Sequence, residues 1–226
     1  MSVMDKAEKK AAHLRGAKET QAPLAPQDNA KCRQILEGAR TVFRAKGFDG
    51  ASMETIAREA NVSKGTLYVY FESKEALFEA LILADRHTQA ESLLKFNTEH
   101  PDMITDLKSL GRRYVRLMVS QDKIATLRMV LGAAEKFPQF GRLLYEAGPV
   151  QGAIRLGAYL DTCVAAGKLK SCDTVRAAEH FFELCVASLV KRRMFGMINT
   201  VEEAEIEKTV DLAVDIFLNG YGSGKS

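Results

Sequence analysis

The stretch from Ser52 to Phe71, SMETIAREANVSKGTLYVYF, constrains the fold more than any other part of the chain. Its first half carries apolar residues at the i, i+3, i+4 and i+7 spacing of a helix, at Met53, Ile56, Ala57 and Ala60. In the second half, Leu67 and Phe71 repeat that stripe one helical turn apart. We therefore expect two short amphipathic helices with a sharp break between them.

The break between these helices is predicted at Asn61. Ser52 and Ser63 stand at the two helix starts, where a side-chain oxygen accepts a hydrogen bond from an unpaired first-turn N–H. A tight corner needs one residue at positive φ, which Gly or Asn adopts most readily. Small Ala57 lets the two helices approach closely. The pattern is typical of a helix-turn-helix, whose second helix can enter the major groove of DNA.

The second helix has a polar face that points away from Leu67 and Phe71. Hydroxyl groups on this face can bind base edges or phosphates, and Lys64 can bind a phosphate or a guanine edge. The candidate DNA-binding residues are Ser52, Thr55, Ser63, Lys64, Gly65, Thr66, Leu67, Tyr68, Tyr70 and Lys74. A helical hairpin with a solvated outer face is the alternative interpretation of the same pattern.

From about Gln34 to Leu77 the chain resembles the tetracycline-repressor-like (TetR) transcriptional regulators. The resemblance rests on the run FRAKGFDGASMETIAREANVSKGTLYVYFESKEAL, with a Gly-aromatic pair before the corner and Tyr-x-x-Phe-x-Ser-Lys-x-x-Leu after it. Asn61 departs from the family, which more often has Gly there, but Asn satisfies the same backbone requirement. The resemblance implies DNA binding by the second helix, and a divergent helical C-terminal domain that binds inducers and dimerises.

The rest of the chain also shows helical patterning. We expect helices over residues 31–46, 74–97, 101–118, 122–136, 139–147, 149–166 and 173–195, and a last one that begins at a capping box, Thr200-x-x-Glu203. No segment shows a convincing period of two, so the predicted fold class is all-α. A disordered arm over residues 1–28 precedes a three-helix DNA-binding domain over 29–80. A long helix joins that domain to a larger helical ligand-binding and dimerisation domain over 81–226.

Flexible and aromatic apolar side chains are frequent on the helices of the C-terminal half. Such side chains can line a cavity for a hydrophobic small molecule, although each one singly is more often part of a core. The candidate ligand-binding residues are Tyr114, Met118, Met129, Phe137, Phe140, Tyr145, His180 and Phe181. The run MVLGAAEKFPQFGRLLYEAGP also looks like that of regulators in the same family that are linked to efflux pumps.

A four-helix interface between two copies is expected from the helices at 150–165 and 178–190, as in the family. Its candidate residues are Ile154, Ala158, Phe182, Cys185 and Leu189. Two copies are also physically sensible because one helix-turn-helix contacts too few bases for specificity, whereas a two-fold dimer reads a palindrome.

Composition and motifs give no indication of catalysis, of a cofactor or of a metal site. The four histidines are scattered, the four cysteines form no C-x-x-C pair, and no nucleophile or phosphate-binding motif occurs. The net charge is only +3, and no apolar run is long enough to span a membrane. The start of the chain lacks the apolar region of a secretory signal, so we expect a cytoplasmic protein.

The sequence therefore predicts a homodimeric repressor that binds a palindromic operator and is released by a small hydrophobic ligand. Ligand binding would swing the helix that begins at Lys74 and separate the two recognition helices. One alternative is a helix-turn-helix regulator controlled by a protein partner, or by oxidation of Cys163, Cys172 or Cys185. A helical enzyme or adaptor with an idle helix-turn-helix is the alternative from another class.

Overall fold

The structure, a computed structural model, describes residues 26–93 and 102–224. The chain divides into two compact units, Met1–Gln34 and Ile35–Ser226. The first is described only where α2 (Pro26–Gly50) begins, so most of the predicted disordered arm lies outside the described residues. Residues 26–28 of that arm are helical rather than disordered. All the functional features that follow lie in the second unit.

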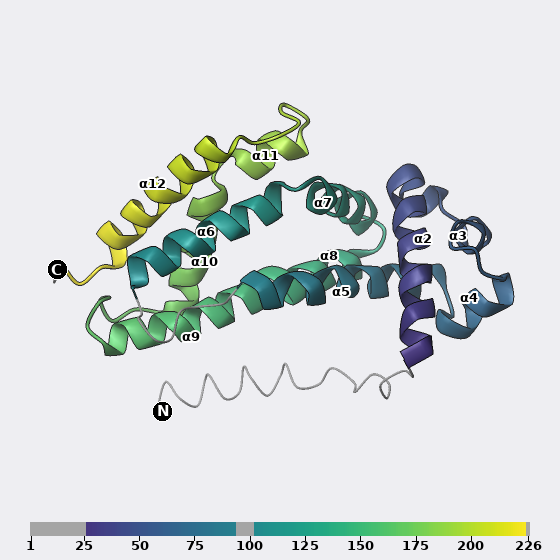
Figure 1. Cartoon of the computed structure of the whole chain (residues 1–226), viewed down its shortest axis with the longest axis horizontal. Helices are drawn as coiled ribbons and strands as arrows, with labels where there is room; N and C mark the ends of the chain where they lie inside the picture. The colour runs from purple at the N-terminus through teal and green to yellow at the C-terminus, as the bar shows by residue number, and fades with distance from the viewer. Residues whose placement is uncertain (1–25, 94–101, 225–226) are drawn as a thin grey trace. The chain divides into compact units, whose positions relative to one another are not determined.

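Four helices form the DNA-binding region: α2, α3 (Met53–Glu59), α4 (Lys64–Tyr70) and α5 (Lys74–Leu93), as Figure 1 shows. The helical conformation of α2 is interrupted at Gly47, with φ 68° and ψ 177°, where the sequence predicts its end. The apolar stripes meet in a core in which Phe43, Ile56, Leu67 and Phe78 are fully buried. The helix that begins at Lys74 is described as far as Leu93, short of the predicted end near residue 97.

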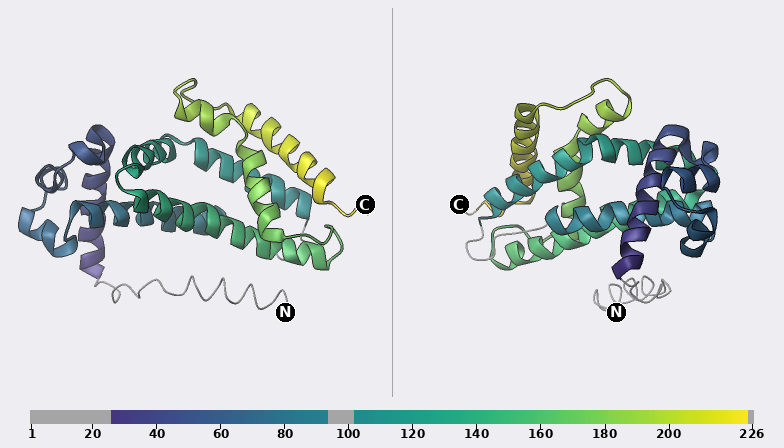
Figure 2. Two further views of the ribbon diagram at one scale, coloured as in Figure 1. Left: turned by 180° about the vertical axis from the view of Figure 1, so that it is seen from behind. Right: turned by 45° about the vertical axis from the view of Figure 1, so that its right-hand side comes forward.

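The C-terminal region continues with helices only, as the two views of Figure 2 show. They are α6 (Met103–Val119), α7 (Gln121–Ala134), α8 (Pro138–Tyr145), the π-helical segment η2 (Glu146–Val150), α9 (Gln151–Ala165), α10 (Thr174–Val186), α11 (Leu189–Met194) and α12 (Glu203–Tyr221). Within the described ranges the sole β-type pairing is a single bridge between Leu169 and Gly222. The all-α prediction is confirmed, whereas the domain boundary at residue 80 stays a prediction.

Helix α10 packs against three neighbours, α6, α9 and α12, and so forms the centre of the C-terminal core. Phe181 of α10 meets Phe217 of α12 edge to face, with ring centroids 5.5 Å apart. A Cβ on Gly111 of α6 would lie 2.7 Å from Val210 and 3.1 Å from the sulfur of Cys185. Only glycine therefore allows α6 to approach α10 and α12 this closely.

Three expected helix boundaries in this region were wrong. The helix predicted over 173–195 is split by Ala187, which adopts φ 35° and ψ −120° and separates α10 from α11. Pro149 begins no helix: it lies within η2, where a wider turn accommodates a residue without an N–H donor. Glu202, not Thr200, is the N-cap of α12, and it makes no side-chain capping bond.

No helix in the described ranges is both long enough and apolar enough to cross a membrane. The same ranges contain no group of three or more His, Cys, Asp or Glu side chains arranged to hold a metal ion. Three acidic side chains of α12, those of Glu203, Glu205 and Asp211, pair with basic side chains of the C-terminal region. Glu203 pairs with Arg116, and Asp211 lies 3.1 Å from Lys108.

Candidate nucleic-acid interface and ligand cavity

The corner between α3 and α4 has the predicted caps and turn. The Ser52 hydroxyl accepts a hydrogen bond from the Thr55 N–H (3.2 Å), and Ser63 accepts one from the Thr66 N–H (2.9 Å). Asn61 has φ 51°, which lets the Val62 N–H donate to the Ala57 carbonyl at 2.9 Å. Helix α3 therefore ends, and α4 begins, where the sequence predicts.

Helix α2 supports this corner through a glycine that sequence reasoning did not single out. A Cβ on Gly38 would lie 2.7 Å from the Cα, Cβ and N atoms of Ala60. Any larger residue at position 38 must push the end of α3 away, because the atoms in contact belong largely to backbone. The available signal in the sequence was the position of Gly38 one helical turn before Val42, on the apolar face of the same helix.

The exposed side of α4 is formed by Ser63, Lys64, Gly65, Tyr68 and Val69, with Thr66 and Tyr70 half-buried at its margins. Val69 was missed from the sequence, although its side chain is 83% exposed. An apolar side chain at such a position can contact a thymine methyl group in the major groove. The structure therefore leaves these seven residues, six of which carry side chains, available for contacts with DNA.

Leu67 and Lys74 have roles other than direct DNA contact. Leu67 is fully buried, so it fixes α4 on the core and cannot reach a base. The Lys74 ammonium donates to the carbonyls of Phe48 (2.8 Å) and Ala51 (3.0 Å) and lies 4.4 Å from the centre of the Phe48 ring. Lys74 thus ties the start of α5 to the chain just before α3.

The hydroxyls of Ser52 and Thr55 lie at the start of α3, with Ser52 exposed and Thr55 half-buried. Their two oxygens are 2.9 Å apart, and those of Ser63 and Thr66 are 2.8 Å apart. In each pair, the hydrogen bond between the two hydroxyls fixes the orientation of their side chains. Such oriented hydroxyls are suited to phosphate contacts, which position a protein on the duplex without reading sequence.

A cavity of about 310 Å³ lies in the C-terminal region, between α6, α7, α8, η2, α9 and α10. Three of the predicted ligand-binding residues line it: Tyr114, Met118 and Tyr145. Phe182, which the sequence assigns to the dimer interface, lines it too, with its ring 4.5 Å from that of Tyr114. Burial raises the pKa of Tyr114, with a smaller contribution from the charge of Glu183, so the hydroxyl stays protonated.

The other predicted ligand-binding residues lie elsewhere. Phe140 is fully buried in an aromatic cluster that also contains Phe137, Phe43, Phe48 and Phe78. The ring centroids of Phe48 and Phe137 are 4.8 Å apart, and those of Phe78 and Phe140 are 4.7 Å apart. This cluster joins α2 and α5 to α8. Apolar spacing alone identifies these side chains as buried but does not reveal the surface against which they pack.

Met129, Phe181 and His180 are also outside the cavity. Met129 and Phe181 are buried core residues. His180 is exposed, and its Nδ1 lies 2.7 Å from the Tyr221 hydroxyl. It borders a second hollow between α10 and α12.

The predicted dimer residues divide into an exposed and a buried set. Ile154 and Ala158 are exposed on α9, whereas Cys185 and Leu189 are buried inside their own chain and Phe182 faces the cavity. Buried side chains cannot contact a second copy without unfolding. The exposed apolar residues beside the second hollow are Leu212 and Ile216 of α12.

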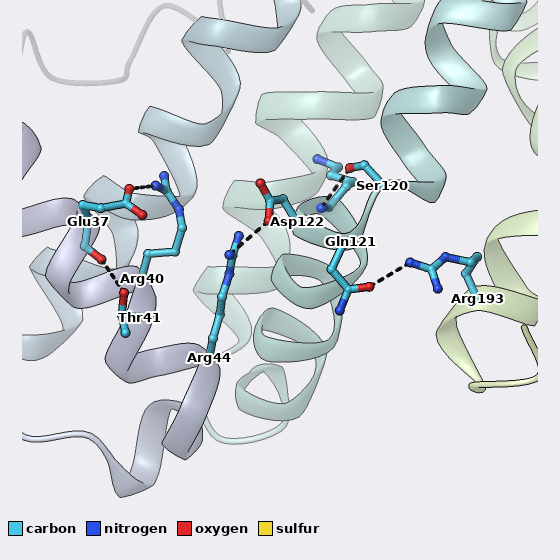
Figure 3. Close-up of polar contacts among 9 residues, drawn as sticks. Glu37, Arg40, Thr41, Arg44, Ser120, Gln121, Asp122 and Arg193 are labelled. Carbon is cyan, nitrogen blue, oxygen red and sulfur yellow. Dashed lines mark hydrogen bonds and ion pairs between the residues drawn. The ribbon is translucent and has the colours of Figure 1, made fainter. Parts of the chain in front are cut away.

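Ion pairs connect the cavity helices to the DNA-binding region. Arg44 of α2 lies 3.0 Å from Asp122 at the start of α7, and the neighbouring Gln121 accepts a hydrogen bond from Arg193 at 2.9 Å (Figure 3). At the other end of α7, Lys136 donates to Asp49 at 2.6 Å. Helix α7 also carries cavity-lining side chains, so one helix contacts both regions.

The helix-turn-helix, followed by a helical C-terminal region, defines the class of DNA-binding transcriptional regulators, and comparison with known families agrees. The pattern of the bacterial regulatory proteins of the tetR family matches residues 35–81. That of the AefR-like transcriptional repressor C-terminal domain matches residues 105–223, more than half of the chain. The chain belongs to the TetR family of transcriptional regulators. The members of this family are regulators and not enzymes, as the sequence predicts.

Two curated relatives match over short segments. UidR of Escherichia coli, an HTH-type transcriptional regulator, is 46% identical over 63 residues, which are 28% of this chain and 31% of UidR. IcaR of Staphylococcus aureus, the negative transcriptional regulator of the biofilm operon icaADBC, is 39% identical over 46 residues, which are 20% of this chain and 25% of IcaR. The chain thus spans less than a third of the length of these relatives.

Solved structures match over nearly the whole chain. A TetR-family transcriptional regulator from Mesorhizobium loti has a TM-score of 0.80 and 29% identity, and the match covers 88% of this chain and 100% of that one. The flavonoid-responsive regulator FrrA has a TM-score of 0.76 and 30% identity over the same shares of the two chains. The relation therefore includes the C-terminal helices as well as the helix-turn-helix.

Proposed function

We propose that this protein is a homodimeric transcriptional repressor that binds a palindromic operator in the cytoplasm and is released from it by a small hydrophobic ligand. The observation that carries the proposal is α4, a short helix anchored by fully buried Leu67 with its polar side exposed. Such a helix presents hydrogen-bonding groups to a DNA groove at a fixed angle.

Each part of the α4 surface has a distinct role in this proposal. Lys64 binds a guanine edge or a phosphate, and Tyr68 and Tyr70 bind the backbone through their hydroxyls. Gly65 allows close approach, and Val69 supplies an apolar contact. Lys74 acts indirectly, because its bonds to the Phe48 and Ala51 carbonyls hold the chain that leads into α3.

The proposed dimer uses α10 and α12. Exposed Leu212 and Ile216 stand beside a hollow that both helices line, so a second copy related by two-fold symmetry would bury them. Ile154 and Ala158 of α9 form the alternative surface named by the sequence. Two-fold pairing by either surface presents two α4 helices to one palindrome.

Ligand control is supported by the cavity and by its connections. A volume of about 310 Å³ lies at the lower end of the range for small-molecule sites. FrrA, to which the chain is similar over its C-terminal helices, is a flavonoid-responsive regulator. Helix α5 packs against α8, η2 and α6, and α7 holds Arg44 through Asp122. A ligand that binds one arrangement of these helices more tightly than the other favours that arrangement, and with it one position of α4. The difference in affinity for the two states sets how far the equilibrium shifts.

Control by cysteine oxidation receives no such support. Burial raises the pKa of all four thiols, that of Cys185 to about 12. A raised pKa lowers the fraction of thiolate, which is the reactive form. The small-molecule interpretation is therefore preferred.

The proposal is tested by titrating the full chain against DNA from upstream of its own gene over a series of salt concentrations. Lys64→Ala should weaken specific binding and lower the salt slope by about one phosphate if Lys64 binds the backbone, or relax specificity at one base if it binds guanine. Lys191→Ala, at an exposed position of α11, removes the same charge away from α4 and should change neither. If wild-type protein binds this DNA no more tightly than random duplex, the proposed operator role fails there.

A further inference from the structure

We infer that the cavity takes a small organic anion, with an apolar body and one acidic group. This inference deepens the proposed function, on which it rests, by naming the chemical class of the ligand.

The first observation is the charge of the cavity wall. Among the described residues that line it there are two basic side chains, Lys123 of α7 and Arg155 of α9, and neither Asp nor Glu. An ionised ligand buried in an apolar cavity needs an opposite charge to offset its lost hydration. An organic cation would find only like charges in this wall, whereas an anion would find charges of the opposite sign.

Arg155 is the better placed of the two to bind a ligand. Its side chain is exposed, and no hydrogen bond or ion pair joins it to another residue of the described ranges. Arg112 and Lys108, by contrast, are both paired with Asp211. The guanidinium of Arg155 can therefore meet a carboxylate with two parallel hydrogen bonds without breaking an existing pair.

A neutral donor supplements these charges. Tyr114 lines the cavity, and its hydroxyl makes no hydrogen bond to any residue in the described part of the chain. Because it stays protonated, it can donate to an acidic group. Glu183, whose charge acts on Tyr114, borders the second hollow instead of this cavity.

The remaining wall determines the body of the ligand. Leu127, Val130 and Leu144 supply aliphatic surface, and the rings of Tyr114 and Phe182 meet at 49°. With about 310 Å³ available, at the lower end of the range for small-molecule sites, the cavity suits a compact ring system rather than a long lipid.

The test uses three probes that share one ring system and differ in charge: 2-naphthoate, 2-naphthylmethanol and 2-naphthylmethylammonium. Binding to the full-length protein is measured by calorimetry, and operator release by each probe is measured separately. We expect 2-naphthoate to bind about tenfold more tightly than the alcohol, the factor typical of one charged hydrogen bond, and the ammonium to bind most weakly.

Arg155→Met identifies the source of the preference. It should reduce the affinity for 2-naphthoate about tenfold and leave that for 2-naphthylmethanol within about twofold, because the aliphatic stem is kept. Arg142→Met is the matched control, since Arg142 is exposed on α8 but does not line the cavity. It removes one positive charge and should leave both affinities unchanged.

The outcomes separate this inference from the proposed function. If the alcohol or the ammonium binds as tightly as 2-naphthoate and releases the operator, the anion inference is overturned and ligand-released repression stands. If none of the probes binds, or Arg142→Met lowers affinity as much as Arg155→Met, the inference is also overturned. If the protein binds no operator, the proposed function fails, and the calorimetric order of the three probes still decides the charge of the ligand.

Discussion

The two candidate binding sites of this protein are built in opposite ways. The DNA-facing surface comes from one stretch of twenty residues, in which buried Leu67 supports the chain and exposed Lys64 and Tyr68 face outwards. The cavity is assembled from six elements between Leu110 and Phe182. In the hairpin, support and contact belong to different side chains. In the cavity, the same side chains do both, so a change in its wall alters ligand contact and packing together.

The aromatic cluster and the ion pairs between these sites are where the contrast can be tested. The cluster of Phe43, Phe48, Phe78, Phe137 and Phe140 connects α2 and α5 to α8, and Asp122 connects α7 to α2. If the sites are coupled, changes here should affect both. If they are independent modules, such changes should affect stability alone.

The largest effect is expected from Phe140→Ala. Phe140 is fully buried against Phe48 and Phe78, so truncation leaves a cavity and should lower the free energy of unfolding by about 3–5 kcal/mol. Denaturant unfolding measures this value, and operator binding should weaken in parallel. Phe195→Ala, at a side chain 80% exposed, should stay within about 0.5 kcal/mol. A loss below about 1 kcal/mol for Phe140→Ala would mean that the cluster does not join the two regions.

A smaller effect is expected from Gly38→Ala, which tests the hairpin alone. The new Cβ would lie 2.7 Å from Ala60 backbone atoms, and overpacking of this kind costs about 1–3 kcal/mol. Gly132→Ala is the matched control, because nothing lies within 4 Å of that Cβ and α7 should gain about 0.5–1 kcal/mol. Thermal unfolding shows which substitution lowers the stability and which one raises it. If the two substitutions changed the stability equally, Gly38 would not be the residue that supports the corner.

The same contrast explains what the sequence could and could not predict. The hairpin was predictable residue by residue: Ser52, Ser63 and Asn61 are the caps and the positive-φ corner that were expected. These features depend on interactions within a few residues, which local sequence specifies. Family membership and the all-α class followed from the same local signals.

The cavity was only partly predictable because its wall depends on contacts between distant helices. Apolar spacing marks Met118 and Phe140 alike as inward-facing, yet one lines the cavity and the other belongs to the aromatic cluster. The break at Ala187 carries no signal, because alanine favours helix and yet adopts φ 35° there. The exposed and buried sides of α10 were likewise indistinguishable until α6 and α12 were in place.

A third prediction tests the link through α7. Asp122→Asn removes the charge opposite Arg44 at 3.0 Å, and as a partly exposed pair it should cost less than about 1 kcal/mol of stability. Ligand-induced release of the operator should nevertheless weaken, because the pair connects a cavity helix to α2. Coupling is measured as the ratio of operator affinities with and without ligand, and it is reciprocal. The exposed control Asp215→Asn should leave that ratio unchanged.

The smallest effect is expected at Asp49, which faces Lys136 at the far end of α7. The hydrogen bond from the Lys136 ammonium, at 2.6 Å, holds the pKa of the Asp49 carboxyl below its usual value. A carboxyl whose pKa is lower in the folded than in the unfolded state contributes its full stability above the unfolded pKa. This contribution begins to fall below about pH 4 and is lost once the pH has fallen through the folded-state pKa. NMR titration of the Asp49 carboxyl measures this directly.

Lys136→Met should return the pKa of Asp49 towards its usual value, whereas Lys208→Met, on α12, should leave it in place. An Asp49 pKa that does not respond to Lys136→Met would show that this fully exposed pair does not form in solution. The connection between the two sites would then depend on Arg44–Asp122 and the aromatic cluster. Because Asp49 lies on the chain that leads from α2 into α3, a pair that does form gives the end of α7 a direct effect on where α3 begins.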